Sequence, residues 1–128
     1  MLNWKDALLK KYDFIFEDCY ELNPPDGWEV IVQTLVEYIH WHNHLHGSKI
    51  QIWNITERNG GLKVQLTDNP RFIDVPEEIH GAVYFAEKLS CRTCKFCGSN
   101  GEFLKIKNKE NKLIMATVCK EHKECLNN

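Results

Sequence analysis

The chain has 128 residues, a mass of 15.0 kDa, 43% hydrophobic and 27% charged residues and a formal net charge of −2. This length fits one domain, or one domain with a small appended module, and the apolar fraction excludes a wholly disordered chain. No apolar run approaches the ~18 residues of a membrane span, and residues 1–6 lack the basic and apolar blocks of a signal peptide. We therefore expect a cytoplasmic protein without a membrane partner.

Two helices are predicted before the first strand. Apolar residues recur at roughly helical spacing over residues 4–16, with Asn3 as the N-cap. The second helix has Asp26 as its N-cap and stops at Gly47. Its apolar face follows the spacing i, i+3, i+4, i+7, i+8, i+11 and comprises Trp28, Ile31, Val32, Leu35, Val36 and Ile39.

A β-hairpin is predicted next. Residues 49–57 are rich in Ile and Trp, and residues 62–67 alternate between apolar and polar side chains. Between them lies Asn59-Gly60-Gly61, and these residue types tolerate the positive φ angles that tight hairpin turns require.

A third helix is predicted over residues 76–90, with Pro76 in its first turn and an apolar face made of Ile79, Ala82, Val83, Ala86 and Leu89. Short strands over 102–107 and 112–118 flank a polar turn. The predicted fold is α+β, with two main helices packed on a β-hairpin. We place a helix–hairpin–helix body in residues 1–90 and a zinc module in residues 91–128.

The strongest chemical signal is a metal-ligand pattern. Cys94 and Cys97 form C-x2-C followed by Gly98, and after 21 residues Cys119 and His122 form C-x2-H. Three thiolates and an imidazole complete a tetrahedral zinc shell, and the gap accommodates one hairpin that returns the chain to the metal. The order of knuckle, hairpin and ligand pair opening a short helix is that of a treble-clef zinc finger. A closed shell of four protein ligands indicates one structural Zn²⁺.

Other cysteines leave the ligand assignment open. Cys91 also forms C-x2-C with Cys94, and Cys125 lies shortly after His122, so either can replace a named ligand. Cys19 stands alone and is interpreted as a small buried hydrophobe.

Four histidines alternate within residues 40–46, at positions His40, His42, His44 and His46. On a helix they divide into two i, i+4 pairs that point about 200° apart, so the four cannot meet one ion. One of these histidine pairs can form a second metal site if residues elsewhere in the chain supply further ligands. The other interpretation is that these side chains suit the negative end of a helix dipole.

The small net charge conceals a division along the chain. Residues 1–87 carry 7 basic and 14 acidic residues, whereas residues 88–128 carry 9 basic and 4 acidic residues. A basic tail module indicates an anionic partner, attraction to the acidic body, or simply a solvated lysine-rich surface. The candidate contacts for a nucleic acid or other partner are Arg92, Lys95, Phe96, Lys105, Lys107 and Lys120.

Several segments resemble a family of small bacterial and phage proteins to which no activity is assigned. They include the segment Asp26-Gly27-Trp28, the hairpin around Gly60-Gly61-Leu62, the knuckle with Cys94 and Cys97, and the later pair Cys119 and His122. Family members carry GDGW, FGGLRFY and TCE.CG…LC..H at the corresponding places. The resemblance implies a shared fold, a mobile-element setting and this choice of ligands, but it does not include the histidine cluster.

Three functions follow from these patterns. The first is a non-enzymatic binding protein whose partner is a host defence, transcription or replication protein if the chain is phage-encoded; its exposed-aromatic candidates are Trp41, Trp53, Tyr84 and Phe96. The second is nucleic-acid binding through the basic module. The third is a metal-dependent hydrolase that uses the histidine cluster with Asp18, Glu21 or Glu37.

Overall fold

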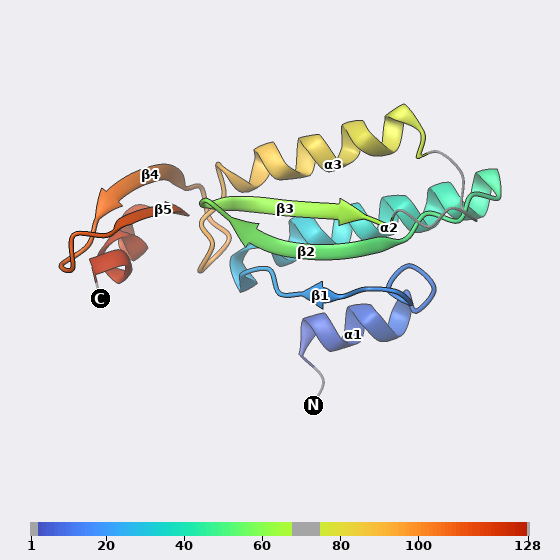
Figure 1. Ribbon diagram of the computed structural model, residues 1–128, viewed down its shortest axis with the longest axis horizontal. Helices are drawn as coiled ribbons and strands as arrows, with labels where there is room; N and C mark the ends of the chain where they lie inside the picture. Colours follow the sequence, from blue (N-terminus) through green and yellow to red (C-terminus); the bar gives the residue numbers. More distant parts are fainter. Residues whose placement is uncertain (1–2, 68–74, 128) are drawn as a thin grey trace.

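The computed structural model describes residues 3–67 and 75–127 and has an α+β fold with two small sheets (Figure 1). No helix in this part of the chain is long and apolar enough to cross a membrane. The elements are α1 (Trp4–Lys11), β1 (Glu21–Leu22), η1 (Asp26–Trp28), α2 (Glu29–His46), β2 (Ile52–Arg58), β3 (Gly61–Leu66), α3 (Glu77–Ser90), β4 (Glu102–Lys107), β5 (Leu113–Val118) and η2 (Lys120–Asn127).

Helix α2 confirms the predicted apolar face and stop, but its start differs from the prediction. The predicted apolar side chains are buried, and Gly47 ends the helix in the left-handed conformation with φ 65°. The prediction of Asp26 as N-cap is wrong, because residues 26–28 form a 3-10 turn before the helix. The Asp26 carboxylate instead accepts a hydrogen bond from Trp4 Nε1 at 2.9 Å, which ties α1 to this turn.

Helix α1 begins as predicted and ends early. The Asn3 side chain caps it by accepting from the Asp6 amide at 2.9 Å. The predicted continuation to residue 16 is wrong, because the helix ends at Lys11. The Asp13 carboxylate accepts the Phe14 amide at 2.8 Å, a local bond that competes with helical hydrogen bonding.

The three-stranded sheet has the order β1-β2-β3, with β1 parallel and β3 antiparallel to β2. The hairpin prediction is confirmed. Arg58 pairs with Gly61 across a two-residue turn, in which Asn59 has φ 52° and Gly60 has φ 85°. Both angles are positive, as this tight turn requires.

Helix α3 covers the free edge of β3. Leu62 donates its backbone N–H to Ser90 Oγ at 2.8 Å, and Val64 donates its N–H to Glu87 Oε2 at 3.0 Å. An open strand edge pairs readily with other chains. The side chains of Ser90 and Glu87 accept hydrogen bonds from the β3 amides that point away from β2. These bonds hold α3 against the strand edge.

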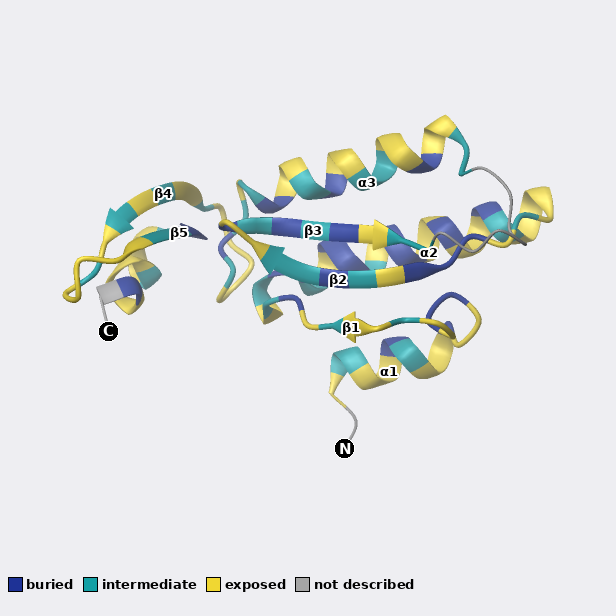
Figure 2. Ribbon diagram, viewed as in Figure 1, coloured by how far each residue is buried: buried dark blue, intermediate teal, exposed yellow. Residues whose placement is uncertain are grey.

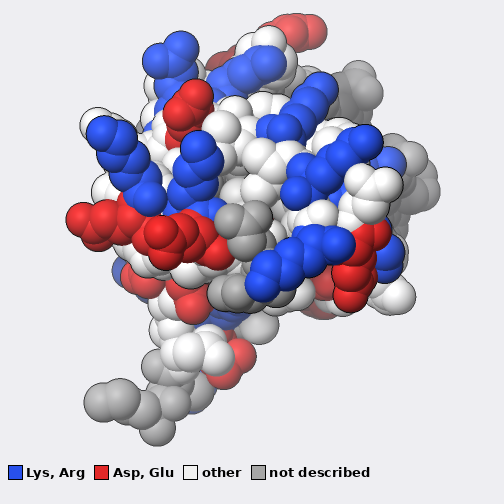
Figure 3. Space-filling model, turned by 90° about the vertical axis from the view of Figure 1, so that its left-hand side faces the viewer, with Lys and Arg blue, Asp and Glu red and all other residues white. Residues whose placement is uncertain are grey.

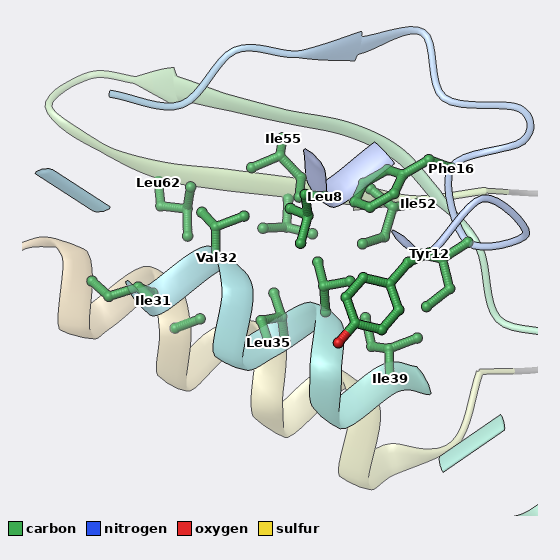
Figure 4. Close-up of a cluster of buried hydrophobic side chains, with 14 of the residues drawn as sticks. Leu8, Tyr12, Phe16, Ile31, Val32, Leu35, Ile39, Ile52, Ile55 and Leu62 are labelled. Atoms are coloured by element: carbon green, nitrogen blue, oxygen red, sulfur yellow. The ribbon is translucent and has the colours of Figure 1, made fainter. Parts of the chain in front are cut away.

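The main core lies where α2 packs against the sheet and α1 (Figure 4). Ile39, Ile52, Ile55 and Ile79 are fully buried within it. The predicted apolar face of α3 is only partly buried: Ile79 and Ala86 are inside, whereas Leu89 is exposed, contrary to its predicted place on the core face.

A second, much smaller cluster belongs to the C-terminal part of the chain. Strands β4 and β5 pair antiparallel from Glu102 with Val118 to Lys107 with Leu113, which agrees with the predicted hairpin. The buried residues of the described cluster are Cys94, Ala116, Val118 and Leu126. This hairpin and η2 lie at the opposite end of the molecule from the C-terminal end of α2 (Figure 1).

Candidate metal centre

Four side chains from two distant segments meet at the second cluster. Cys94 and Cys97 come from the turn between α3 and β4, Cys119 follows β5, and His122 lies in η2. Their ligand atoms all lie within 4.8 Å of one another, and they form the group among the described residues that can hold a metal ion. The structure therefore brings together the four ligands that the sequence spacing predicts.

The separations between the ligand atoms fit one small tetrahedral ion. Zinc bonded to sulfur at about 2.3 Å and to nitrogen at about 2.0 Å places two sulfurs about 3.8 Å apart, and a sulfur and a nitrogen about 3.5 Å apart. The Cys97 and Cys119 sulfurs are 3.8 Å apart, and His122 Nδ1 is 3.6 Å from the Cys94 sulfur and 3.1 Å from that of Cys119.

A tight turn prepares the first two ligands. The amide of Gly98 donates to the carbonyl of Cys94 at 2.9 Å, and the amide of Cys94 donates to the carbonyl of Ser99 at 2.7 Å. Gly98 has φ 81°, a conformation that favours glycine. Burial raises the pKa of the Cys94 thiol, and hydrogen bonds from the backbone amides of Cys119, Cys97 and Phe96 oppose this rise.

Burial and hydrogen bonding shift the pKa values of the four ligands in different directions. Burial raises the pKa of the Cys94 thiol, whereas the Ser99 hydroxyl, 2.9 Å from the Cys97 sulfur, lowers the pKa of Cys97. Burial also raises the pKa of Cys119, but hydrogen bonds from Ser99 and His122 outweigh it and lower this pKa to about 6. The hydrogen bond with Cys119 in turn raises the pKa of His122. Ser99 is a contributor that the sequence analysis did not identify.

The remaining cysteines lie outside the group. Cys91 and Cys19 are half-buried and Cys125 is exposed, and none of the three contributes a sulfur to the four-ligand cluster. Among the described residues, the group that could hold a metal ion therefore contains Cys97 rather than Cys91, and His122 rather than Cys125.

The 3-10 turn η1, which precedes α2, packs directly on the turn that carries the first ligands. The amide of Gly27 donates to the carbonyl of Lys95 at 2.8 Å, and Trp28 Nε1 donates to the carbonyl of Thr93 at 2.9 Å. A Cβ at Gly27 would lie 2.1 Å from the carbonyl oxygen of Cys94, so only glycine fits. Gly27 is a site residue that the ligand spacing does not indicate, and the short motif Asp26-Gly27-Trp28 is the signal that marks it.

The tip of the β2–β3 hairpin makes the second contact with the metal region. Thr117 Oγ1 donates to the carbonyl of Gly60 at 2.9 Å, and a Cβ at Gly60 would lie 2.8 Å from the Phe103 ring. Lys95 Nζ forms an ion pair with Glu57 Oε1 at 2.6 Å. The acidic body and the basic segment thus attract each other at a defined, partly buried point.

Four of the candidate basic contacts are exposed, and one is already paired. Arg92 and Lys120 are exposed, and Lys105 and Lys107 are exposed on β4. Lys95 forms its ion pair with Glu57. Figure 3 views this end of the molecule and shows basic side chains over much of its surface, with acidic ones between them.

The four histidines do not form a metal group. His42 is buried, with Nδ1 3.0 Å from Ser48 Oγ and Nε2 3.1 Å from Glu78 Oε1, whereas His40, His44 and His46 are exposed. The three carboxylates suggested for a hydrolase, Asp18, Glu21 and Glu37, are exposed and join no metal-binding cluster among the described residues.

The candidate aromatic residues are all exposed. Trp53 stacks on Tyr20 with ring centroids 5.6 Å apart, Trp41 lies on α2, and Tyr84 lies on α3. Phe96 lies on the ligand turn, with its ring centroid 5.4 Å from that of His122.

Comparisons with known proteins add no further assignment. No family model matches the chain. No curated protein and no solved structure matches it either.

Proposed function

We propose that this protein is a zinc-stabilised, non-enzymatic binding protein with a treble-clef-like C-terminal module. The observation that carries the proposal is the convergence of three sulfurs and one imidazole nitrogen within 4.8 Å. This donor set is typical of structural zinc, since thiolates and imidazole bind Zn²⁺ in closed tetrahedral sites.

The order of elements supports the treble-clef assignment. The chain passes from the ligand turn through the β4–β5 hairpin to Cys119, and His122 lies in the short helix η2 that follows. A treble clef has this order of knuckle, hairpin and helix, although η2 is a 3-10 helix.

The metal has a clear structural task. The described cluster under β4 and β5 contains few buried side chains, and one of them, Cys94, is itself a ligand. A module with so small a core needs an additional source of stability, which a bound metal supplies on folding.

The closed shell argues for binding rather than catalysis. A catalytic zinc keeps a coordination position for water or substrate, whereas four protein ligands fill a tetrahedral ion. The other polar cluster, around His42, has a structural role. Hydrogen bonds join the His42 ring to Ser48 and Glu78 and hold the C-terminal end of α2 in place.

The stacked pair Tyr20 and Trp53 is the surface that best suits a protein partner. Both rings are exposed beside the three-stranded sheet and are held nearly parallel, at 12°. Trp and Tyr dominate the binding energy of protein interfaces, and rings that are already ordered lose little entropy on binding. If the chain is phage-encoded, the partner is a host protein in the cytoplasm.

Metal analysis of the purified full chain tests the zinc assignment. We expect one Zn²⁺ per chain by elemental mass spectrometry, a loss of that ion in Cys97→Ser, and no change in the control Cys125→Ser. A protein purified without metal, or one equally loaded in both variants, would refute the assignment.

Affinity capture from the native host tests the binding role separately. A protein retained by the wild type and by the control Tyr84→Ala, but lost with Trp53→Ala, supports the proposal. Zinc content that is intact in all three, together with no specific protein captured, would contradict the binding role while leaving the zinc site in place.

Nucleic-acid binding is a second candidate, favoured by the basic side chains on the end of the molecule in Figure 3. Phosphate contacts release counterions, so affinity for DNA or RNA should fall steeply as salt rises. We expect Lys105→Ala with Lys107→Ala to weaken such binding and reduce the salt slope. An absence of binding at low salt would exclude this candidate.

A further inference from the structure

Helices α2 and α3 expose several large apolar side chains on their outer sides, a surface that we name the α2–α3 face. Its members are 40 to 72% exposed and comprise Val30, Tyr38, Trp41, Leu45, Phe85 and Leu89. Those of α2 follow helical spacing on one stripe beside the buried face. Figure 2 shows the exposed residues along the outer side of α3.

A groove runs between the two helices on this face. Its walls include Val30, Thr34 and Tyr38 from α2 and Ala82, Phe85 and Leu89 from α3, and its volume is about 290 Å³. None of the described residues that line it is charged. The groove therefore suits the apolar side chains of a protein better than a highly charged small molecule.

The size of the face fits one half of a stable protein interface. At about 150–250 Å² for a whole aromatic side chain, Tyr38, Trp41 and Phe85 together expose roughly 300 Å². Val30, Leu45 and Leu89 add to this area. The largest apolar patch on a monomer is typically about 300–600 Å². A standard interface buries about 800 Å² on each partner.

The α2–α3 face is self-complementary in charge, because the two ends of α3 carry opposite charges. Glu77 and Glu78 lie at the N-terminal end, and Lys88 and Arg92 lie at or just beyond the C-terminal end. If two copies of α3 cross antiparallel near their midpoints, the acidic end of each meets the basic end of the other, and the helix dipoles are also opposed.

Glycine in the middle of α3 gives independent support. Gly81 has ordinary helical φ, and no heavy atom of the described residues lies within 4 Å of the position its Cβ would take, so no described neighbour requires glycine. A glycine inside a helix costs about 1 kcal/mol relative to alanine. In the antiparallel crossing Phe85, four residues on, lies opposite Gly81 of the other copy, which leaves room for the ring.

We propose that the α2–α3 face is the interface of a two-fold symmetric homodimer, with α3 packed antiparallel on its own copy. A second copy of this chain supplies every complementary feature from one surface. The Phe85 ring of each copy fits the space at Gly81 of the other, and the acidic end of each α3 meets the basic end of the other. Glu78 remains available for this role, because its side chain is 55% exposed while it accepts from His42. The inference does not depend on the proposed function.

Sedimentation velocity of the metal-loaded full chain over a range of concentrations tests the dimer. We expect a species of twice the 15.0 kDa chain mass that dissociates on dilution and does not grow further. Phe85→Glu buries a charge twice per dimer and should weaken association by about a hundredfold or more. Tyr20→Glu, an exposed aromatic change away from the face, should leave the dimer intact.

A charge exchange tests the antiparallel arrangement. Lys88→Glu alone should weaken the dimer, and Lys88→Glu with Glu78→Lys should restore it, with circular dichroism and zinc content verifying the fold of each variant. A chain that stays monomeric at millimolar concentration, an open-ended series of oligomers, or a dimer unaffected by Phe85→Glu would overturn the proposal. A dimer that Phe85→Glu dissociates but the charge exchange does not restore would overturn the antiparallel geometry.

Discussion

The hydroxyl of Thr117, on β5, donates a hydrogen bond of 2.9 Å to the carbonyl oxygen of Gly60, at the tip of the β2–β3 hairpin. Thr117 is fully buried. The bond joins the β4–β5 hairpin to the main sheet. The Gly27 amide and the Lys95 side chain form further bonds between the two regions. The metal region is therefore docked on the body by specific buried contacts.

Replacing Thr117 by valine should lower the free energy of unfolding by about 1–3 kcal/mol, because the buried Gly60 carbonyl loses its partner while the shape is kept. Urea denaturation of the metal-loaded protein measures this. Thr56→Val, on β2, is the control and should change stability by less than about 0.5 kcal/mol. Equal effects of the two changes would mean that the bond contributes nothing specific.

Substitutions at Gly47 and Gly60 distinguish the cost of backbone strain from the cost of steric overlap. Gly47 and Gly60 both have positive φ, but a Cβ at Gly47 meets nothing within 4 Å, whereas at Gly60 it lies 2.9 Å from the Ala116 amide nitrogen. Gly47→Ala should destabilise by about 1 kcal/mol. Gly60→Ala should cost about 1–3 kcal/mol more, since overlap adds to strain. Thermal unfolding that gives the same loss for both would contradict the docking of the hairpin tip.

Removal of the Ser90 hydroxyl should loosen the edge of β3. Ser90→Ala leaves the buried Leu62 amide without an acceptor and should cost about 1–3 kcal/mol. Hydrogen exchange gives a local measurement: the Leu62 amide should exchange faster in the variant, while the Val64 amide, held by Glu87, should change less. Unchanged protection at Leu62 would show that another group satisfies this amide.

Loss of the metal should unfold the C-terminal hairpin and leave most of the helical signal. The small cluster around Ala116 and Val118 loses the ion, whereas α2 keeps the main core. A strong chelator, or Cys97→Ala, should therefore abolish protection of β4 and β5 amides but retain most of the circular dichroism at 222 nm. Cys125→Ala is the control, and full retention of β4 and β5 protection without metal would contradict the expectation.

Metal affinity should fall as the pH falls, because thiolates and neutral imidazole are the binding forms. The raised pKa of Cys94 means that the metal displaces its proton at neutral pH, which weakens binding about tenfold per unit of acidification. Below about pH 6 the Cys119 thiolate is also protonated, so the dependence should steepen there. Competition with a zinc indicator from pH 8 to 5 measures this, and a flat profile would exclude thiolate ligands.

The local parts of this fold were predictable from the sequence. The 3.6-residue spacing fixes which side of α2 is buried, and Asn59-Gly60 predicts a tight turn because both residues accept positive φ. Ligand spacing likewise indicated a metal site. These features depend on neighbours within a few residues, and the sequence shows such neighbours directly.

Tertiary structure decided the remainder, because it depends on residues far apart in the chain. Spacing alone does not distinguish Cys97 from Cys91, and Gly98 and the resemblance favoured Cys97. The fold then brings Cys119 and His122 to Cys94 and Cys97 and leaves Cys91 outside the group. Only packing shows that Leu89 lies outside the core and that Gly27 touches the ligand turn. The sequence determines which elements form and which atoms can bind a metal, and long-range contacts decide which of those atoms meet.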